Sequence, residues 1–134
     1  MGEFSWPVRV YYEDTDAGGI VYYANYLKFC ERARTEWLRA FGVEQDIWLQ
    51  QNIGFVVRHV ALDLRAPARF NDELTVTVVP QRIRKASIEC TQEVLNQDGK
   101  VLCVATVTAA CVNLATMKPV AIPGAIIEVL GRGS

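Results

Sequence analysis

Residues 13–26, EDTDAGGIVYYANY, bring together side chains that could do chemistry. Asp16 offers a carboxylate that could act as an acid or a base. Gly18 and Gly19 follow and let the backbone turn tightly and approach a ligand. Tyr23 lies seven residues after Asp16, near a predicted helix start where backbone N–H groups lack intrahelical partners. The stretch therefore predicts an active site, although the spacing alone leaves open an aspartate that only supports the turn.

Asp14 lies two residues before Asp16, and we interpret it as structural or as a salt-bridge partner. His59 is the sole histidine and could be a base, but its mid-strand position favours a structural or interface role. The four cysteines form no CxxC pair and have no zinc-site spacing, so we interpret them as small buried side chains in a reducing compartment; they are Cys30, Cys90, Cys103 and Cys111. No metal site is expected.

One long helix must position the end of this stretch. Apolar residues recur at intervals of three, four and seven, which predicts an amphipathic helix over 24–41. Asn25 could cap its start and Gly42 could end it. A short helix could follow at 44–52. The residues that we expect on the buried face are Tyr26, Leu27, Cys30, Ala33, Trp37, Leu38 and Phe41.

The rest of the chain has the pattern of β-strands, which we predict at 7–12, 55–66, 73–83, 87–95 and 100–113. Alternation in 55–66 places Val56, Val60, Leu62 and Leu64 on one face. Residues 96–99, NQDG, predict a hairpin turn. Residues 100–113 are apolar on both faces, which predicts a central strand buried on both sides.

Clustered strands with one helix indicate an α+β fold in a single domain over residues 1–134. The helix can cover one face of a curved five-stranded antiparallel sheet. No second helix layer is expected, so a second copy of the chain is the simplest cover for the other face. We therefore predict a homodimer or a homotetramer.

The composition is that of a globular protein, with 134 residues, 51% of them hydrophobic, and a formal net charge of −1. The chain has no basic block that would favour a nucleic-acid partner. No apolar run approaches the ~18 residues of a membrane span. The N-terminus is too short and too acidic for a signal peptide, so we expect a soluble, cytoplasmic protein.

At this point the residues resemble a known family. Residues 10–34, VYYEDTDAGGIVYYANYLKFCERAR, are similar to the opening of the hotdog-fold thioesterases of the 4-hydroxybenzoyl-CoA thioesterase family. Residues 55–74 and the closing MKPVAIP at 117–123 also match, so the resemblance extends from about Trp6 to Ile122. Within the family the chain is most similar to the YbgC type, the acyl-CoA thioesterases associated with the bacterial Tol-Pal system.

The resemblance implies roles for the first stretch. It makes Asp16 the catalytic carboxylate, as nucleophile or general base, and the Tyr23 amide an oxyanion donor. Many YbgC-type members have histidine at the position of Tyr23, and a phenol with a pKa near ~10 is a poor replacement as a base. Tyr12 matches a tyrosine proposed to assist, although packing beside the turn explains it equally well.

The resemblance also implies an acyl-CoA substrate without a separate cofactor, and contact with an acyl carrier protein is a further option. The motif places Gly19 and Val21 against the substrate. The CoA phosphates need positive groups, and RIRK at 82–85 supplies Arg82, Arg84 and Lys85 unless it is only a solvated strand end. Other basic candidates are Arg58, Arg65 and Arg69, whereas Glu31, Arg32, Arg34, Glu36 and Arg39 are expected on a solvated helix face.

The implied activity is hydrolysis of a short-chain aliphatic or aryl acyl-CoA to the free acid and CoA. The alternative is a non-catalytic hotdog module that binds thioesters or serves as a scaffold. A hydratase of the same fold is disfavoured, because its pattern has a histidine shortly after the aspartate and this chain has none there.

Overall fold

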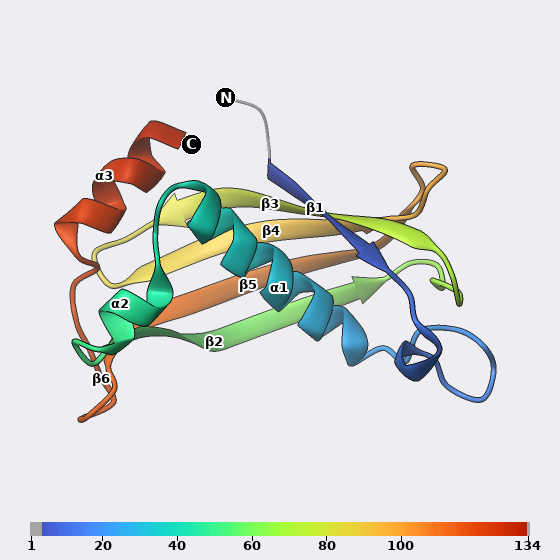
Figure 1. The fold of residues 1–134 in the computed structure, drawn as a ribbon, viewed down its shortest axis with the longest axis horizontal. Coiled ribbons are helices and arrows are strands. Elements are labelled where there is room, and N and C mark those ends of the chain that lie inside the picture. Colours follow the sequence, from blue (N-terminus) through green and yellow to red (C-terminus); the bar gives the residue numbers. More distant parts are fainter. Residues whose placement is uncertain (1–3, 134) are drawn as a thin grey trace.

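One antiparallel sheet curls around helix α1 in the computed structural model, which describes residues 4–133 (Figure 1). The order of the strands is β1-β3-β4-β5-β2, and a two-residue strand, β6, pairs with β5. The predicted domain limits at residues 1 and 134 lie outside the described residues. The strands are β1 (Phe4–Arg9), β2 (Ile53–Leu64), β3 (Glu73–Ile83), β4 (Ser87–Leu95), β5 (Val101–Asn113) and β6 (Lys118–Pro119).

The predicted first strand at 7–12 is displaced, because β1 ends at Arg9 and a 3₁₀ turn, η1 (Tyr12–Asp14), follows it. The Thr15 amide and hydroxyl both donate to the Tyr12 carbonyl, which closes this turn at 3.1 and 2.7 Å. Pro7 lies inside β1 opposite Thr75, which an edge strand tolerates. The chain therefore leaves the sheet just before the acidic stretch.

Helix α1 (Asn25–Ala40) packs its apolar face on the concave side of the sheet. Leu27 was expected on that face but is 39% exposed, whereas Phe29, which was not among the residues predicted to be buried, is fully buried. Asn25 does not cap the helix, because its side-chain amide donates to the Asp14 carbonyl. Gly42 has a φ of +82° and ends the helix as predicted. The buried residues of α1 are Tyr26, Phe29, Cys30, Ala33, Trp37 and Leu38.

Strand β2 contains a bulge that changes which face its side chains occupy. Val56 pairs with Ala110, but Val60 pairs with Val107, and the register shifts between Val57 and His59. Because Ala110 and Val107 lie on opposite faces of β5, Val56 and Val60 also face opposite ways. The prediction that all four even-numbered residues share one face is therefore wrong for Val56.

Strand β5 is central, as predicted. Its inner side chains are fully buried against the helix side, among them Cys103, Ala105 and Val107. On the outer face Thr106 is exposed and Val104 is half-buried. In the single chain the predicted burial on both faces is therefore incomplete, and the outer face is open for a cover.

Two shorter helices accompany α1. Helix α2 (Gln45–Leu49) confirms the short helix expected within 44–52. Helix α3 (Gly124–Gly133) was not predicted, and it packs Ile126 and Leu130 into the core near the β3–β4 connection (Figure 1). The prediction that everything after residue 52 is β is corrected by α3. Within residues 4–133, none of the helices is long and apolar enough to span a membrane.

Candidate active site

Asp14 holds the acidic loop to the start of α1. Its Oδ2 accepts from the Tyr11 amide at 2.8 Å. Its carbonyl accepts from the Tyr22 amide at 3.1 Å and from the Asn25 side chain at 2.8 Å. These contacts confirm a structural role and place the loop beside the first turn of the helix.

Asp16 lies in a tight turn closed by its own backbone. Its amide donates to the Ile20 carbonyl at 2.9 Å, and the Gly19 amide donates to its carbonyl at 3.0 Å. Its Oδ1 accepts from the Gly18 amide at 2.8 Å, which is the turn-supporting contact anticipated from the sequence. The side chain is exposed, and Oδ2 accepts no hydrogen bond from the described residues. One carboxylate oxygen is therefore fixed while the other is available.

The glycines are required by this geometry. Gly19 has a φ of +78°, which L-residues rarely adopt. A Cβ at Gly18 would lie 3.3 Å from Asp16 Oδ1, so the carboxylate would have to move by a few tenths of an ångström. A side chain at either position would therefore disturb the carboxylate or the turn that presents it.

The connection between β2 and β3 is hydrogen-bonded both to the loop and to α1. Val21 is buried, and its amide donates to the Ala68 carbonyl at 2.8 Å. The Ala68 amide donates to the buried Tyr26 hydroxyl of α1 at 3.1 Å. Burial raises the pKa of Tyr26, and the Ala68 N–H partly offsets that rise. Helix, connection and loop therefore form one hydrogen-bonded unit.

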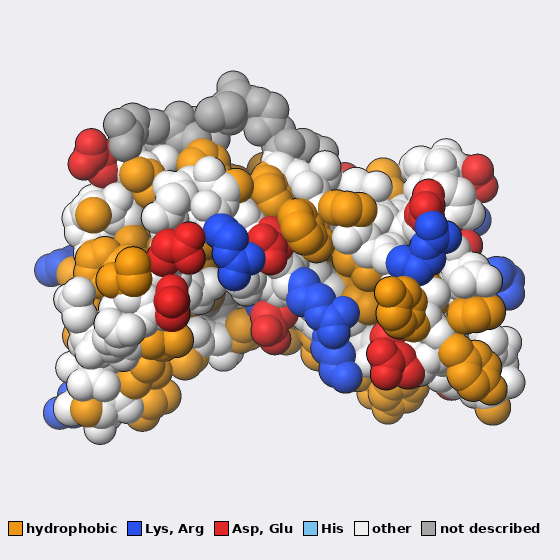
Figure 2. All heavy atoms as spheres, in the orientation of Figure 1, with side chains coloured by type: hydrophobic (Ala, Val, Ile, Leu, Met, Phe, Trp, Pro, Cys, Tyr) orange, Lys and Arg blue, Asp and Glu red, His pale blue; other side chains and the backbone are white. Residues whose placement is uncertain are grey.

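Exposed aromatic side chains flank the Asp16 turn in the sequence and lie on the connection next to it. Tyr23 is 57% exposed, and its ring centroid lies 5.0 Å from that of Tyr22. Tyr12 is exposed and packs edge-on against Phe70, with centroids 6.0 Å apart. Figure 2 shows hydrophobic side chains gathered at this end of the molecule. Among the described residues the Tyr23 amide donates no hydrogen bond, so it is available to a ligand.

The structure does not bring the RIRK segment to this loop within one chain. Arg82, Arg84 and Lys85 are exposed at the far end of β3 (Figure 1). β3 begins at Glu73, opposite Arg9, and ten further residues at about 3.3 Å each give a separation of roughly 33 Å. Arg69 is a basic residue beside the loop, and its backbone bridges Ile20. His59 lies in the middle of β2, opposite Thr108 on the outer face.

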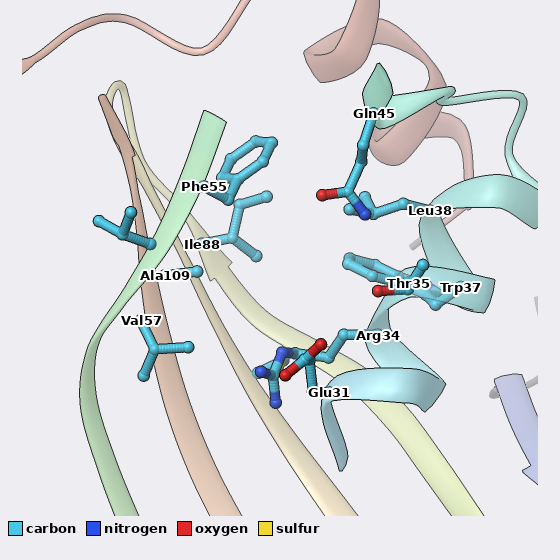
Figure 3. Close-up of a pocket in the computed structure, with 12 residues that line it drawn as sticks. Glu31, Arg34, Thr35, Trp37, Leu38, Gln45, Phe55, Val57, Ile88 and Ala109 are labelled. Carbon is cyan, nitrogen blue, oxygen red and sulfur yellow. The ribbon is translucent and has the colours of Figure 1, made fainter. Parts of the chain in front are cut away.

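A cavity of about 400 Å³ lies between α1 and strand β2, away from the loop (Figure 3). Arg34 lines it, half-buried, and its Nη1 donates to Gln92 Oε1 at 3.0 Å. The expectation that Arg34 belongs to a solvated face is therefore wrong, because β4 supplies a buried acceptor beneath the helix. Gln92 is fully buried, and its position among the inward-facing residues of β4 was the signal in the sequence.

The cysteines are free and buried, which confirms their structural interpretation. Burial raises the pKa of Cys30 to about 12 and those of Cys90 and Cys103 to about 11, and it also raises the pKa of Cys111. Thiols with such pKa values hold little thiolate at neutral pH. No cluster of three or more potential metal-ligating side chains is found within the described part of the chain.

Comparison with known proteins places this arrangement in a family. Residues 10–130 match the model of the thioesterase-like superfamily. The chain is 44% identical to the acyl-CoA thioester hydrolase YbgC of Escherichia coli O6:H1, covering 92% of each chain. It is 48% identical to the acyl-CoA thioesterase YbgC of Haemophilus influenzae, covering 90% of this chain and 88% of the relative.

The fold has solved counterparts. The crystal structure of Slr0204, a 1,4-dihydroxy-2-naphthoyl-CoA thioesterase from Synechocystis, superposes with a TM-score of 0.89 at 23% identity, covering 97% of this chain and 96% of that one. That identity supports the fold alone. Together with the sequence matches, it shows that this chain is a hotdog-fold member of the thioesterase-like superfamily and belongs with the YbgC acyl-CoA thioesterases.

Proposed function

We propose that this protein, a thioester hydrolase by family, hydrolyses an acyl-CoA with Asp16 as its catalytic carboxylate. The observation that carries the proposal is the state of the carboxylate. One oxygen is fixed by the Gly18 amide, and the other has no partner among the described residues. The carboxylate lies in a loop hydrogen-bonded to the start of α1, where negative charge is favoured.

The Tyr23 amide is the proposed oxyanion donor. It precedes α1 by two residues and donates no hydrogen bond within the described part of the chain. In the tetrahedral intermediate the thioester carbonyl oxygen becomes an anion, which a fixed N–H stabilises without reorganisation. This role needs only the backbone, so it does not depend on the phenol that replaces the family's histidine.

Two routes are open to Asp16. As a general base it accepts a proton from water while the water oxygen bonds to the carbonyl carbon; the C–S bond then breaks, and the CoA thiolate takes up a proton. As a nucleophile its oxygen bonds to the carbonyl carbon and expels CoA thiolate, leaving a mixed anhydride that water hydrolyses. Both routes yield the free acid and CoA.

The direct test is Asp16→Asn. Asparagine keeps an oxygen that can accept from the Gly18 amide, so the turn should survive, but the basic or nucleophilic oxygen is lost. We expect kcat to fall by about 10² to 10⁴. Tyr23→Phe is the matched control, because it removes only an exposed phenol and keeps the amide, and it should cost much less.

The activities of Asp16→Asn and Tyr23→Phe each test one part of the proposal. A folded Asp16→Asn protein that hydrolyses acyl-CoA at nearly the wild-type rate would refute the proposed role of the carboxylate. A loss in Tyr23→Phe as large as that in Asp16→Asn would show that the phenol takes part in the reaction. A single turnover in H₂¹⁸O tests the nucleophilic route, since water that attacks the Asp16 carboxyl carbon of the mixed anhydride leaves its label in Asp16, which the general-base route never does.

The acyl group is proposed to be a short aliphatic or aryl group carried on CoA, with acyl carrier protein as a further option. The alternative is a non-catalytic module that binds thioesters, and the available oxygen of Asp16 favours the enzyme. A panel of aliphatic and aryl acyl-CoAs, followed by release of the thiol, distinguishes these possibilities.

A second copy of the chain is proposed to complete the molecule. The outer face of β5 is only half covered, and β2 is an edge strand with Val57, Val60 and Leu64 substantially exposed. Exposed apolar side chains along an edge strand favour association. Sedimentation at micromolar concentration should show a dimer or tetramer, and a monomer would contradict this proposal.

A further inference from the structure

The cavity between α1 and β2 is apolar except at one side. Trp37, Leu38, Phe55 and Val57 supply apolar walls, and the polar lining comes mainly from the helix. In Figure 3 the Arg34 and Glu31 side chains both extend from α1 toward the side where Val57 lies. An apolar cavity with a few convergent polar groups is the usual form of a site for a small ligand.

Gln92 fixes the guanidinium of Arg34. Gln92 Oε1 accepts from Arg34 Nη1 at 3.0 Å, and its Nε2 donates to the Cys30 carbonyl at 3.0 Å. Both polar atoms of this fully buried side chain are thereby used, so its orientation is determined. Arg34 donates one hydrogen bond to Gln92 and makes no other hydrogen bond or ion pair among the described residues. Since a guanidinium has five N–H donors, several are left for a ligand.

The cavity is aligned with the active-site end of α1. Leu27, Glu31, Arg34 and Leu38 are spaced by four, three and four residues, so they form one stripe along the helix. Glu31 and Arg34 follow Asn25 by six and nine residues, which is about 9 and 13.5 Å along the axis. Leu27, on the same stripe, is exposed and lies between them and the helix start. An acyl group held by its carbonyl at the Tyr23 amide could extend along this stripe into the cavity.

We propose that Arg34, positioned by Gln92, determines specificity by donating a hydrogen bond to an acceptor group at the distal end of the acyl chain. This inference rests on the proposed thioesterase function. A distal hydroxyl suits the site, because its oxygen accepts from Arg34 while its hydrogen points to the neighbouring Glu31 carboxylate. A plain methyl end would displace water from the Arg34 donors without supplying an acceptor, which is unfavourable.

The experiment compares octanoyl-CoA with 8-hydroxyoctanoyl-CoA, whose extended chains match the rise of about 9 Å from Asn25 to Glu31, within reach of the Arg34 side chain, which leans toward the helix N-terminus. In Arg34→Met, the ratio of kcat/KM for the hydroxylated over the plain substrate should fall at least about tenfold. Arg32→Met is the matched control, because it removes the same charge from an exposed position on the same helix outside the cavity, and its ratio should equal that of the wild type. Gln92→Met should lower the ratio by less, because it frees Arg34 without removing it.

The same preference is measured by calorimetry in the Asp16→Asn background, as the ratio of the Kd values of the two substrates, which requires no hydrolysis. If the wild-type protein hydrolysed neither substrate while the ratio of Kd values still depended on Arg34, the result would count against the proposed thioesterase function and not against the role of the cavity. A purely structural Arg34 would weaken both substrates equally, and an unchanged ratio in Arg34→Met would overturn the inference. If Arg34→Met does not fold, Arg34→Lys is used instead. Lysine keeps the positive charge but lacks the planar guanidinium group with its several N–H donors, so the ratio of kcat/KM values should again fall.

Discussion

Replacing Tyr26 by phenylalanine tests the hydrogen-bonded unit that holds the active-site loop. Tyr26 is 3% exposed, and its hydroxyl accepts from the Ala68 amide at 3.1 Å. Phenylalanine keeps the ring, including its edge-on packing against Phe29, and removes only the oxygen. The Ala68 amide, in a fully buried residue, is then left without an acceptor.

The expected loss of stability comes from the Ala68 amide, which has no acceptor in the variant. An unsatisfied buried N–H costs about 1–3 kcal/mol, so the free energy of unfolding should fall by that amount. With a urea m-value of about 2 kcal/mol/M, the midpoint of unfolding moves down by roughly 0.5–1.5 M. Because the Ala68 carbonyl accepts from Val21 in the same loop, kcat should also fall, by less than in Asp16→Asn.

Urea titrations followed by circular dichroism measure the first effect, and thiol release measures the second. Tyr23→Phe is the control for stability, since its phenol is exposed and makes no hydrogen bond with the described residues. If Tyr26→Phe has the same unfolding midpoint as Tyr23→Phe, the Ala68–Tyr26 contact does not stabilise the protein and the reasoning fails.

Two further predictions concern pH and the CoA phosphates. The free energy of unfolding should fall as pH rises from about 9 to 11. The reason is that unfolded thiols lose their protons near pH 9.0, whereas in the folded protein the pKa values of Cys30, Cys90 and Cys103 are raised to about 12, 11 and 11. The stability that these raised pKa values contribute is fully present below pH 9, and above it is lost at up to about 1.4 kcal/mol per pH unit per thiol. Urea titrations across this range should show a shallower slope in Cys90→Ala. Arg84→Ala combined with Lys85→Ala should raise KM for acyl-CoA and change kcat much less, if a second chain brings these residues to the phosphates. An unaltered KM there, with a raised KM in Arg69→Ala, would place the phosphates at the loop instead.

Much of the fold was predictable because it rests on local periodicity. The 3.6-residue repeat placed α1 within one residue at each end, and alternation, weak in 73–83 and clear in 87–95, placed β3 and β4 without error. The bulge in β2 was not predictable, because an extra residue at Arg58 leaves the apolar pattern unchanged while reversing the faces. Helix α3 was missed because its glycines interrupt a short apolar run.

Some features of the candidate site were likewise predictable from the sequence, and others depend on the topology. Asp16, Gly19 and Val21 lie in one continuous segment, so their neighbourhood follows from the sequence. The separation of Arg84 from that segment depends on the direction in which β3 runs, which is a property of the topology. Arg34 was misassigned because a charged helix residue is usually solvated, and only its pairing with Gln92 across 58 positions reveals otherwise.

The four buried thiols give the protein an internal reporter of its own opening. They lie on α1, β4 and β5, and none is paired in a disulfide. A thiol reagent can reach each one only when the surrounding elements separate, so the labelling rate at each cysteine reports the free energy of the opening that exposes it. Cys103, near the start of β5, and Cys111, near its end, lie on one strand. Their relative rates would show whether this strand leaves the sheet as a unit or frays from one end.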